Sequence, residues 1–222
     1  MAKRRRVGNL LALAVLALAA ERPMHPYEMA TTLRERGKDR SIKINWGSLY
    51  TVVSNLDKHG LIEATETFRD GRRPERTVYA ITGAGLTELR DWLRELLGTP
   101  EKEYLRLAAG LSLLPGLPPE EAAELLEQRV HALDAETARR QAELDTYLNQ
   151  LPRLFLVEEQ YELAMLRAEA DWTRSLLAEL RDGSFPGLSL WRGVHESGLP
   201  PAEAAVQAMK QWQEEGGEPG QR

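Results

Sequence analysis

An apolar run from Leu10 to Ala20 places the tightest limit on how this chain can fold. The run contains only Leu, Ala and Val, so a helix formed by it is apolar on every side and must be buried. It is far shorter than the ~20 residues of a membrane span, which excludes a transmembrane helix. Because Lys-Arg-Arg-Arg precedes it and Ala-Leu-Ala at 17–19 resembles a cleavage site, a secretory signal peptide is the alternative to a buried helix capped by Asn9.

The stretch after Pro23 decides between these alternatives, because it predicts two further helices that need a partner. One is expected over 25–36, with Pro26 in its first turn. The other is expected over 46–59, with Asn45 as its N-cap. The apolar stripe of the first helix is Tyr27, Met29, Ala30 and Leu33, and that of the second is Leu49, Val52, Val53 and Leu56. Without 10–20 both stripes would lie in water, so we expect a three-helix core and a cytoplasmic protein.

The other side of the 46–59 helix carries small hydrogen-bonding side chains instead of the Glu and Lys mixture of a merely solvated helix. Such a helix suits the major groove of DNA, where each base pair displays its own pattern of donors and acceptors. The residues of this helix and of the turn before it that we expect to contact DNA are Lys43, Ser48, Tyr50, Thr51, Asn55 and Lys58.

Residues 61–82 predict two strands around a basic turn. Asp-Gly at 70–71 is a hairpin signal, and Thr82 is expected to cap a fourth helix that runs to about Leu97. Three helices, two strands and a helix, in that order, predict a winged helix-turn-helix. The arginines of the wing expected to reach phosphates or a minor groove are Arg69, Arg72, Arg73 and Arg76.

Charge is divided unevenly along the chain. Residues 1–97 contain 17 basic and 12 acidic residues, a net charge of +5, whereas 98–222 contain 12 basic and 22 acidic residues, a net charge of −10. The local field matters more for DNA binding than the total of −5 does. The basic first part therefore favours DNA binding, and a chance imbalance of solvated charge is the alternative.

The acidic half predicts a helical domain. A short helix is expected over 101–114, followed by two long helices over 120–151 and 154–181 with heptad seams, which form an antiparallel hairpin. Two helices bury little, so pairing with a second copy is expected, and an intramolecular three-helix bundle is the alternative. We predict a DNA-binding domain over 1–97, a dimerisation and effector domain over 98–183, and a tail over 184–222 with one short helix and a disordered end.

Three motifs together resemble the PadR family of bacterial transcriptional regulators. They are Met-His-Pro-Tyr-Glu-Met at 24–29, Gly-Ser-Leu-Tyr at 47–50 and Gly-Arg-Arg-Pro-Glu-Arg-Thr-Val-Tyr-Ala-Ile-Thr at 71–82. The chain departs from the family at Pro26, where glycine is usual, and at Thr51, where proline is common. The resemblance implies a homodimeric repressor that responds to a small aromatic or cationic effector, with Ser48, Tyr50 and the wing arginines at the DNA.

Other chemistry finds little support in the sequence. The chain has no cysteine and its four histidines are scattered, so we expect no zinc site. Gly-Ala-Gly at 83–85 resembles half of a dinucleotide fingerprint, but Glu88 stands where the third glycine belongs. We therefore expect no enzyme and no cofactor. Aromatic residues that are candidates for an effector cavity at the dimer interface, with ordinary core packing as the alternative, are Trp92, Tyr104, Tyr161 and Trp172.

The sequence thus predicts a mainly helical fold with a small β-hairpin and a DNA-binding regulator. Its expected partners are double-stranded DNA with a pseudo-palindromic operator, a second copy of the chain and a small effector, with no membrane involved. Two alternatives stay open at this point. One is a winged helix used as a protein-protein interaction module without DNA binding, and the other is a secreted helical protein matured after residue 19.

Overall fold

The computed structural model describes residues 8–42, 44, 46–68 and 76–214. The chain divides into two compact units, residues 1–102 and 103–222. Helices make up most of the described chain, together with one two-stranded sheet, which confirms the expected mainly helical fold with a small hairpin. Within the described ranges, no helix is both long and apolar enough to cross a membrane.

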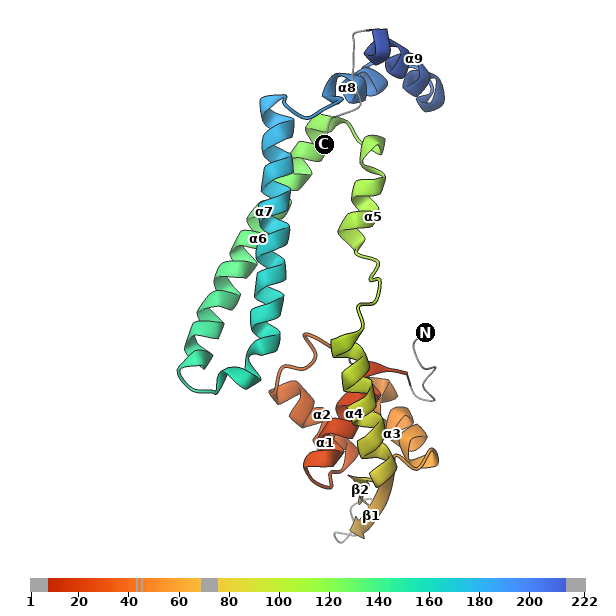
Figure 1. Cartoon of the computed structure of the whole chain (residues 1–222), viewed down its shortest axis with the longest axis vertical. Helices are drawn as coiled ribbons and strands as arrows, with labels where there is room; N and C mark the ends of the chain where they lie inside the picture. Colours follow the sequence, from red (N-terminus) through yellow and green to blue (C-terminus); the bar gives the residue numbers. More distant parts are fainter. Residues whose placement is uncertain (1–7, 43, 45, 69–75, 215–222) are drawn as a thin grey trace. The chain divides into compact units, whose positions relative to one another are not determined.

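The first unit contains four helices and the sheet in its described part (Figure 1). Its elements are α1 (Leu10–Glu21), α2 (Pro26–Glu35), a 3-10 turn (Trp46–Ser48), α3 (Leu49–Lys58), β1 (Ile62–Phe68), β2 (Arg76–Ile81) and α4 (Gly83–Gly98). The strands are antiparallel, with Ile62 opposite Ile81 and Phe68 opposite Arg76. This order of elements is that of a winged helix-turn-helix.

Helix α1 lies at the centre of the first unit. Asn9 begins it as the sequence predicts, because its Oδ1 accepts a hydrogen bond of 2.9 Å from the Leu11 N–H. Eight of the twelve residues of α1 are buried, and the exposed ones are Leu10, Ala17, Ala20 and Glu21. Apolar residues of α2, α3 and α4 complete the same core around it. The apolar run is therefore the central helix on which the rest of this unit packs.

The wing strands are joined to the helices through the loop between α1 and α2. Met24 and Tyr79 exchange two backbone hydrogen bonds, of 3.1 Å and 3.0 Å, so that Met24 extends the sheet beside β2. Met24 is also fully buried in the core. The base of the hairpin is thereby fixed to the three-helix core.

The second unit is built on an antiparallel helical hairpin, α6 (Pro119–Leu148) and α7 (Val157–Asp182) (Figure 1). The seam of the hairpin follows the predicted heptads through most of its length, with Leu126, Val130 and Leu144 buried on α6. Tyr147 and Leu151, which continue the predicted seam, are instead exposed. Helix α5 (Arg106–Ser112) precedes the hairpin, and α8 (Leu188–Glu196) and α9 (Pro201–Glu214) follow it.

Further features of the second unit differ from the sequence prediction. Helix α7 begins at Val157 instead of Leu154, because the residues after Pro152 form a 3-10 turn. The segment 184–214 contains two helices, α8 and α9, where one was expected. Trp191 of α8 is buried against the hairpin, and its Nε1 donates a hydrogen bond of 2.7 Å to the Leu117 carbonyl. The segment after the hairpin is thus partly packed into the second unit.

Candidate nucleic-acid interface

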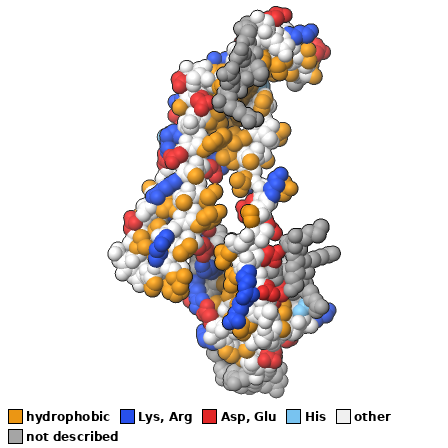
Figure 2. Space-filling model, viewed as in Figure 1, with side chains coloured by type: hydrophobic (Ala, Val, Ile, Leu, Met, Phe, Trp, Pro, Cys, Tyr) orange, Lys and Arg blue, Asp and Glu red, His pale blue; other side chains and the backbone are white. Residues whose placement is uncertain are grey.

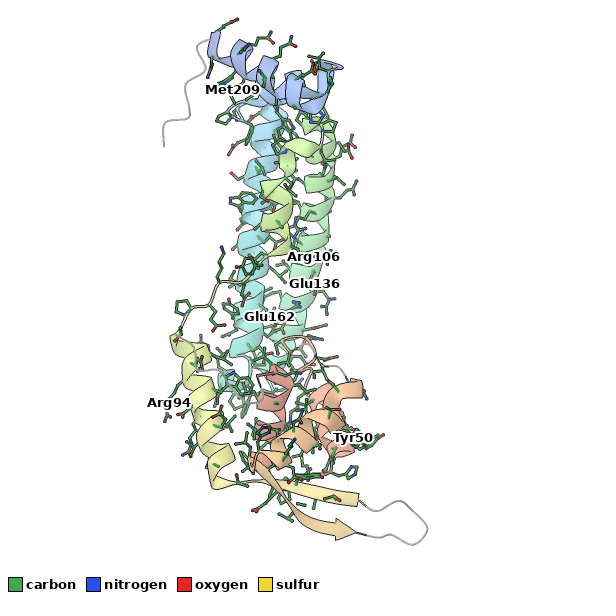
Figure 3. All side chains as sticks on the ribbon, turned by 90° about the vertical axis from the view of Figure 1, so that its right-hand side faces the viewer. Tyr50, Arg94, Arg106, Glu136, Glu162 and Met209 are labelled. Atoms are coloured by element: carbon green, nitrogen blue, oxygen red, sulfur yellow. The ribbon has the colours of Figure 1, made fainter. Side chains whose placement is uncertain are left out.

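Helix α3 presents two chemically distinct sides. Its predicted apolar stripe is buried in the core of the first unit, with Leu56 fully enclosed. On the other side Thr51, Asn55 and Lys58 are exposed, and Tyr50 is 56% exposed and points away from the body of the unit (Figure 3). A helix with this division can lay its polar side against another molecule without disturbing its own core.

The two ends of α3 are defined by backbone geometry. Ser48 precedes the helix and is half-buried, in the 3-10 turn that leads into it. At the other end, Gly60 adopts a φ of 68°, its N–H donates to the Asp57 carbonyl at 2.8 Å, and the Leu61 N–H donates to the Leu56 carbonyl at 2.9 Å. This pair of bonds satisfies the last carbonyls of the helix in the Schellman arrangement, for which glycine is the favoured residue.

Tyr27 corrects one sequence expectation. We expected it in the apolar stripe of α2, but it is 70% exposed, whereas Met29 and Leu33 are buried. The reason is helical geometry, since Tyr27 lies six residues before Leu33 and so falls on a different side of the helix. The exposed ring stands in the first turn of α2, where His25 caps the helix by accepting a hydrogen bond from the Tyr27 N–H. The six-residue separation of Tyr27 and Leu33 in the sequence already indicates that the two side chains lie on different sides of the helix.

The basic residues expected at the interface lie mostly outside the described part of the chain. Lys43 and the wing arginines Arg69, Arg72 and Arg73 fall outside the described residues. Arg76 begins β2 opposite Phe68, and only its backbone is described. The described part of the wing is therefore the pair of strands that leads to and from the basic turn.

The four aromatic residues proposed for an effector cavity do not come together within one unit. Trp92 is only 5% exposed and packs in the core of the first unit, as the alternative of ordinary core packing predicts. Tyr104, Tyr161 and Trp172 belong to the second unit and are exposed. Tyr161 and Trp172 stand eleven residues apart on α7, about three turns, and so lie on the same side of that helix.

Gly85 has a packing role in the first turn of α4. A Cβ atom at Gly85 would lie 1.9 Å from the Leu61 carbonyl oxygen, so only glycine fits at this position. Close packing therefore accounts for a glycine that resembles part of a dinucleotide fingerprint. In the part of the chain that the structure describes, no group of three His, Asp or Glu residues is placed to hold a metal ion.

Ion pairs and burial shift the pKa values of ionisable groups in the first unit. Two hydrogen bonds from the Arg36 guanidinium, of 2.6 Å and 2.8 Å, lower the pKa of Glu21 and join the end of α2 to the end of α1. Burial raises the pKa of Tyr79, and the nearby Asp57 carboxylate adds to this effect. Glu21 belongs to α1 and Tyr79 to β2, so neither group is part of the exposed polar side of α3.

Comparison with solved structures finds proteins of the same architecture. The structure of Bacillus subtilis PadR in complex with operator DNA is similar with a TM-score of 0.62 and 20% identity, over 78% of this chain and 99% of that chain. The same protein in complex with p-coumaric acid gives a TM-score of 0.65 and 18% identity, over 78% and 99% of the two chains. The structure of the Vibrio cholerae virulence activator AphA is similar with a TM-score of 0.59 and 19% identity, over 78% of this chain and 98% of that chain.

A comparison with curated proteins finds no match. The solved structures, at these low identities, show a shared fold. A family model adds sequence evidence, because residues 15–91 match the transcriptional regulator PadR-like family. That segment runs from within α1 to within α4 and contains the three motifs on which the resemblance depends. The resemblance is therefore confirmed over residues 15–91, which match the PadR-like family of transcriptional regulators.

Proposed function

We propose that this regulator binds DNA sequence-specifically, with α3 in the major groove. The observation that carries the proposal is the division of α3 into a buried apolar side and an exposed polar side of Tyr50, Thr51, Asn55 and Lys58. Ser48, at the start of the helix, belongs to the same proposed contact surface. These groups would read base edges, while Lys43, the wing arginines and the basic residues 3–6 supply affinity through phosphates.

The second unit supports the proposal that the chain acts as a homodimer. Helix α7 has an apolar side against α6 and a second apolar side that is exposed, formed by Val157, Tyr161, Met165 and Trp172. Hydrophobic side chains also gather at the turn between α6 and α7 (Figure 2), where Leu154 and Phe155 are exposed. A second copy is the proposed occupant, because a two-fold dimer matches a pseudo-palindromic operator with half-sites about 10 bp or a multiple apart.

We further propose that the dimer represses transcription and that a small aromatic or cationic effector releases it. PadR of Bacillus subtilis is known in complexes with operator DNA and with p-coumaric acid. In this chain Tyr104, Tyr161 and Trp172 are the proposed effector contacts, since they are the exposed aromatic candidates. Effector binding in the helical unit would change the spacing of the two recognition helices.

The proposed site of action is the cytoplasm. Cleavage after residue 19 would remove almost all of α1, around which the core of the first unit is built. The competing function is a winged-helix module that binds protein instead of DNA. The exposed side of α3 favours DNA, because it carries hydrogen-bonding groups suited to base edges, with Tyr50 as its single exposed aromatic residue within the described helix.

A selection experiment tests the proposal. The full chain is used to enrich duplexes from a random-sequence pool, and fluorescence anisotropy then compares the enriched duplex with a scrambled one. Asn55→Ala is expected to reduce the preference for the enriched duplex by about tenfold while scrambled DNA binds as before. The double variant Arg72→Gln and Arg73→Gln is expected to weaken both duplexes about equally and to lower the salt slope by about two.

Control measurements separate a loss of DNA contacts from a loss of folded structure. Circular dichroism of each variant checks that the helices are retained. The role assignment is wrong if Asn55→Ala weakens both duplexes alike and the arginine variant loses only sequence preference. Binding that selects no sequence and does not depend on salt contradicts DNA binding and favours the protein-interaction module.

A further inference from the structure

The end of α3, the end of β2 and the start of α4 meet at four residues, Gly60, Leu61, Thr82 and Gly85. We refer to these residues as the junction. The Thr82 N–H donates to the Leu61 carbonyl at 3.1 Å, directly after β2. Gly60 and Leu61 are the residues that terminate α3, so the backbone contact joins the recognition helix to the wing.

A single hydroxyl group connects the two helices at the junction. Thr82 Oγ1 donates to the Gly60 carbonyl at 2.7 Å, with the Leu61 carbonyl next at 3.2 Å. The same oxygen accepts a hydrogen bond of 3.0 Å from the Gly85 N–H and so caps α4. The hydroxyl therefore uses both its donor and its acceptor capacity, one toward the end of α3 and one toward the start of α4.

Gly85 makes the junction close-packed as well as hydrogen-bonded. A side chain at this position would collide with the Leu61 carbonyl oxygen and would also come within 2.9 Å of Ile81. The first turn of α4 thus presses on the backbone that ends α3. This contact leaves little room for the end of α3 to shift without breaking the bonds of Thr82.

The core contacts of α3 among the described residues are of a different kind. Leu49, Val53 and Leu56 bury it in the core through apolar packing, which holds a helix in place but does not depend on direction. Hydrogen bonds do depend on direction, and reading base edges requires a helix held within about 0.5 Å and 10–20° of its working position. Among the described residues, the junction supplies directional bonds at the C-terminal end of α3, near Asn55 and Lys58.

We propose that Thr82 is a positioning residue for DNA recognition. Its hydroxyl fixes the C-terminal end of α3 against the wing and α4, so that the polar side chains of α3 meet the bases in one orientation. The proposal rests on the proposed function, and it adds a residue that does not touch DNA itself. The proposal predicts that loss of the Thr82 hydroxyl reduces the preference for one DNA sequence and leaves the affinity that comes from phosphate contacts unchanged.

The test uses three variants of the full chain. Thr82→Val keeps the shape of the side chain and removes the hydroxyl, and Thr82→Ser restores the hydroxyl. Thr87→Val is the matched control, because the Thr87 hydroxyl donates only within α4, to the Gly83 carbonyl at 3.0 Å, and is exposed. Affinity for the enriched and scrambled duplexes is measured by anisotropy over a range of salt concentrations.

For Thr82→Val we expect affinity for the enriched duplex to fall about tenfold, with scrambled-duplex affinity and the salt slope unchanged. Thr82→Ser and Thr87→Val should keep the preference of the original chain. Full sequence preference in Thr82→Val overturns the proposal. An equal loss in Thr87→Val also overturns it, because the effect then reflects the stability of α4 alone.

Hydrogen exchange without DNA separates this proposal from the proposed function. We expect the Leu61 and Gly85 amides to exchange about tenfold faster in Thr82→Val and at the original rate in Thr87→Val. If the original chain selects no duplex, the proposed function fails and so does a role of Thr82 in recognition. Unchanged exchange in Thr82→Val overturns the structural part of the proposal, whatever the DNA measurements give.

Discussion

The two units of the molecule bury their apolar residues in different ways. In the first unit, eighteen of the described residues form one buried cluster around α1. In the second unit the buried clusters contain seven and three described residues, spread along a hairpin whose outer side is also apolar. A concentrated core supports a domain by itself, whereas an extended one leaves apolar surface for a partner to cover.

Ion pairs connect the two long helices of the second unit. Along the second unit, arginines bridge the two helices of the hairpin, as in the contacts of Arg129 with Glu169 at 2.8 Å and of Arg174 with Asp134 at 2.8 Å. Such pairs are partly exposed, and solvent screening keeps the contribution of exposed pairs to stability small. Their spacing along α6 and α7 favours one register of the hairpin more than it adds stability.

Removing the same type of side chain from each core is the strongest test of this difference between the two units. Leu16 of α1 is fully buried, and Leu16→Ala is expected to cost about 4 kcal/mol, because the surrounding core leaves a cavity. Leu163→Ala of α7 should cost about 2 kcal/mol, since its cluster of three residues can close more easily. Urea unfolding followed by circular dichroism measures both. A larger loss for Leu163→Ala would contradict the difference between the units.

Two helical glycines offer a second matched pair. Gly85→Ala of the first unit is expected to destabilise by about 3 kcal/mol, because the new methyl group meets the Leu61 carbonyl. In α8 of the second unit, a Cβ at Gly193 would lie 3.7 Å from that of Ala208, an ordinary contact. Gly193→Ala should therefore stabilise by about 0.5–1 kcal/mol through helix propensity. Thermal unfolding checks both signs, and equal shifts would show that the packing of the two units is alike.

Arginines of the hairpin give a third pair. The Arg140 side chain is 16% exposed, bonds to Glu136 and Glu162, and lies 3.6 Å from Glu159 (Figure 3 shows Glu136 and Glu162). Arg140→Gln is expected to cost about 2 kcal/mol, because the carboxylates then face one another without the cation. Arg174→Gln, at an exposed site, should shift the unfolding midpoint much less, because solvent screens its ion pairs. The midpoint of urea unfolding distinguishes these values, and equal losses would exclude a special role for Arg140.

The smallest expected effect is a pH dependence of the hairpin. Hydrogen bonds from Arg139 and Arg140 lower the pKa of Glu136 from its ordinary value of 4.5 to about 2. A depressed pKa means that the charged carboxylate stabilises the fold above about pH 4.5 and that this contribution is lost as the pH falls toward about 2. Thermal midpoints of the original chain and of Glu136→Gln should therefore converge in that range. A difference that grows as the pH falls would have the wrong sign.

Much of the first unit was predictable from the sequence, because its signals are local and repeated. The run at 10–20 admits only burial on all sides, and the spacing of Leu49, Val53 and Leu56 defines the inner side of α3. The three motifs and the Asp-Gly turn then give the order of elements. Which side chains touch DNA stays a prediction, since Lys43 and most wing arginines lie outside the described residues.

The parts that the sequence did not predict depend on contacts between distant residues. Helix α8 follows Gly187 without a side-chain cap, and its burial depends on Trp191 meeting Leu117, far away along the chain. The proposed role of Thr82 has the same origin. The sequence around Thr82 predicts a helix cap, but it does not predict the hydrogen bond from Thr82 to the Gly60 carbonyl. Local patterns predict elements, whereas such long-range bonds emerge only when the elements are packed together.

The character of α1 has a consequence for how a signal could act on the first unit. A helix that is apolar on every side has no polar side to turn toward water, so it cannot loosen by degrees without exposing leucines. The domain around it is therefore expected to respond as a rigid body or to unfold altogether. A signal is therefore expected to act by moving this domain as a whole, and not by loosening its core.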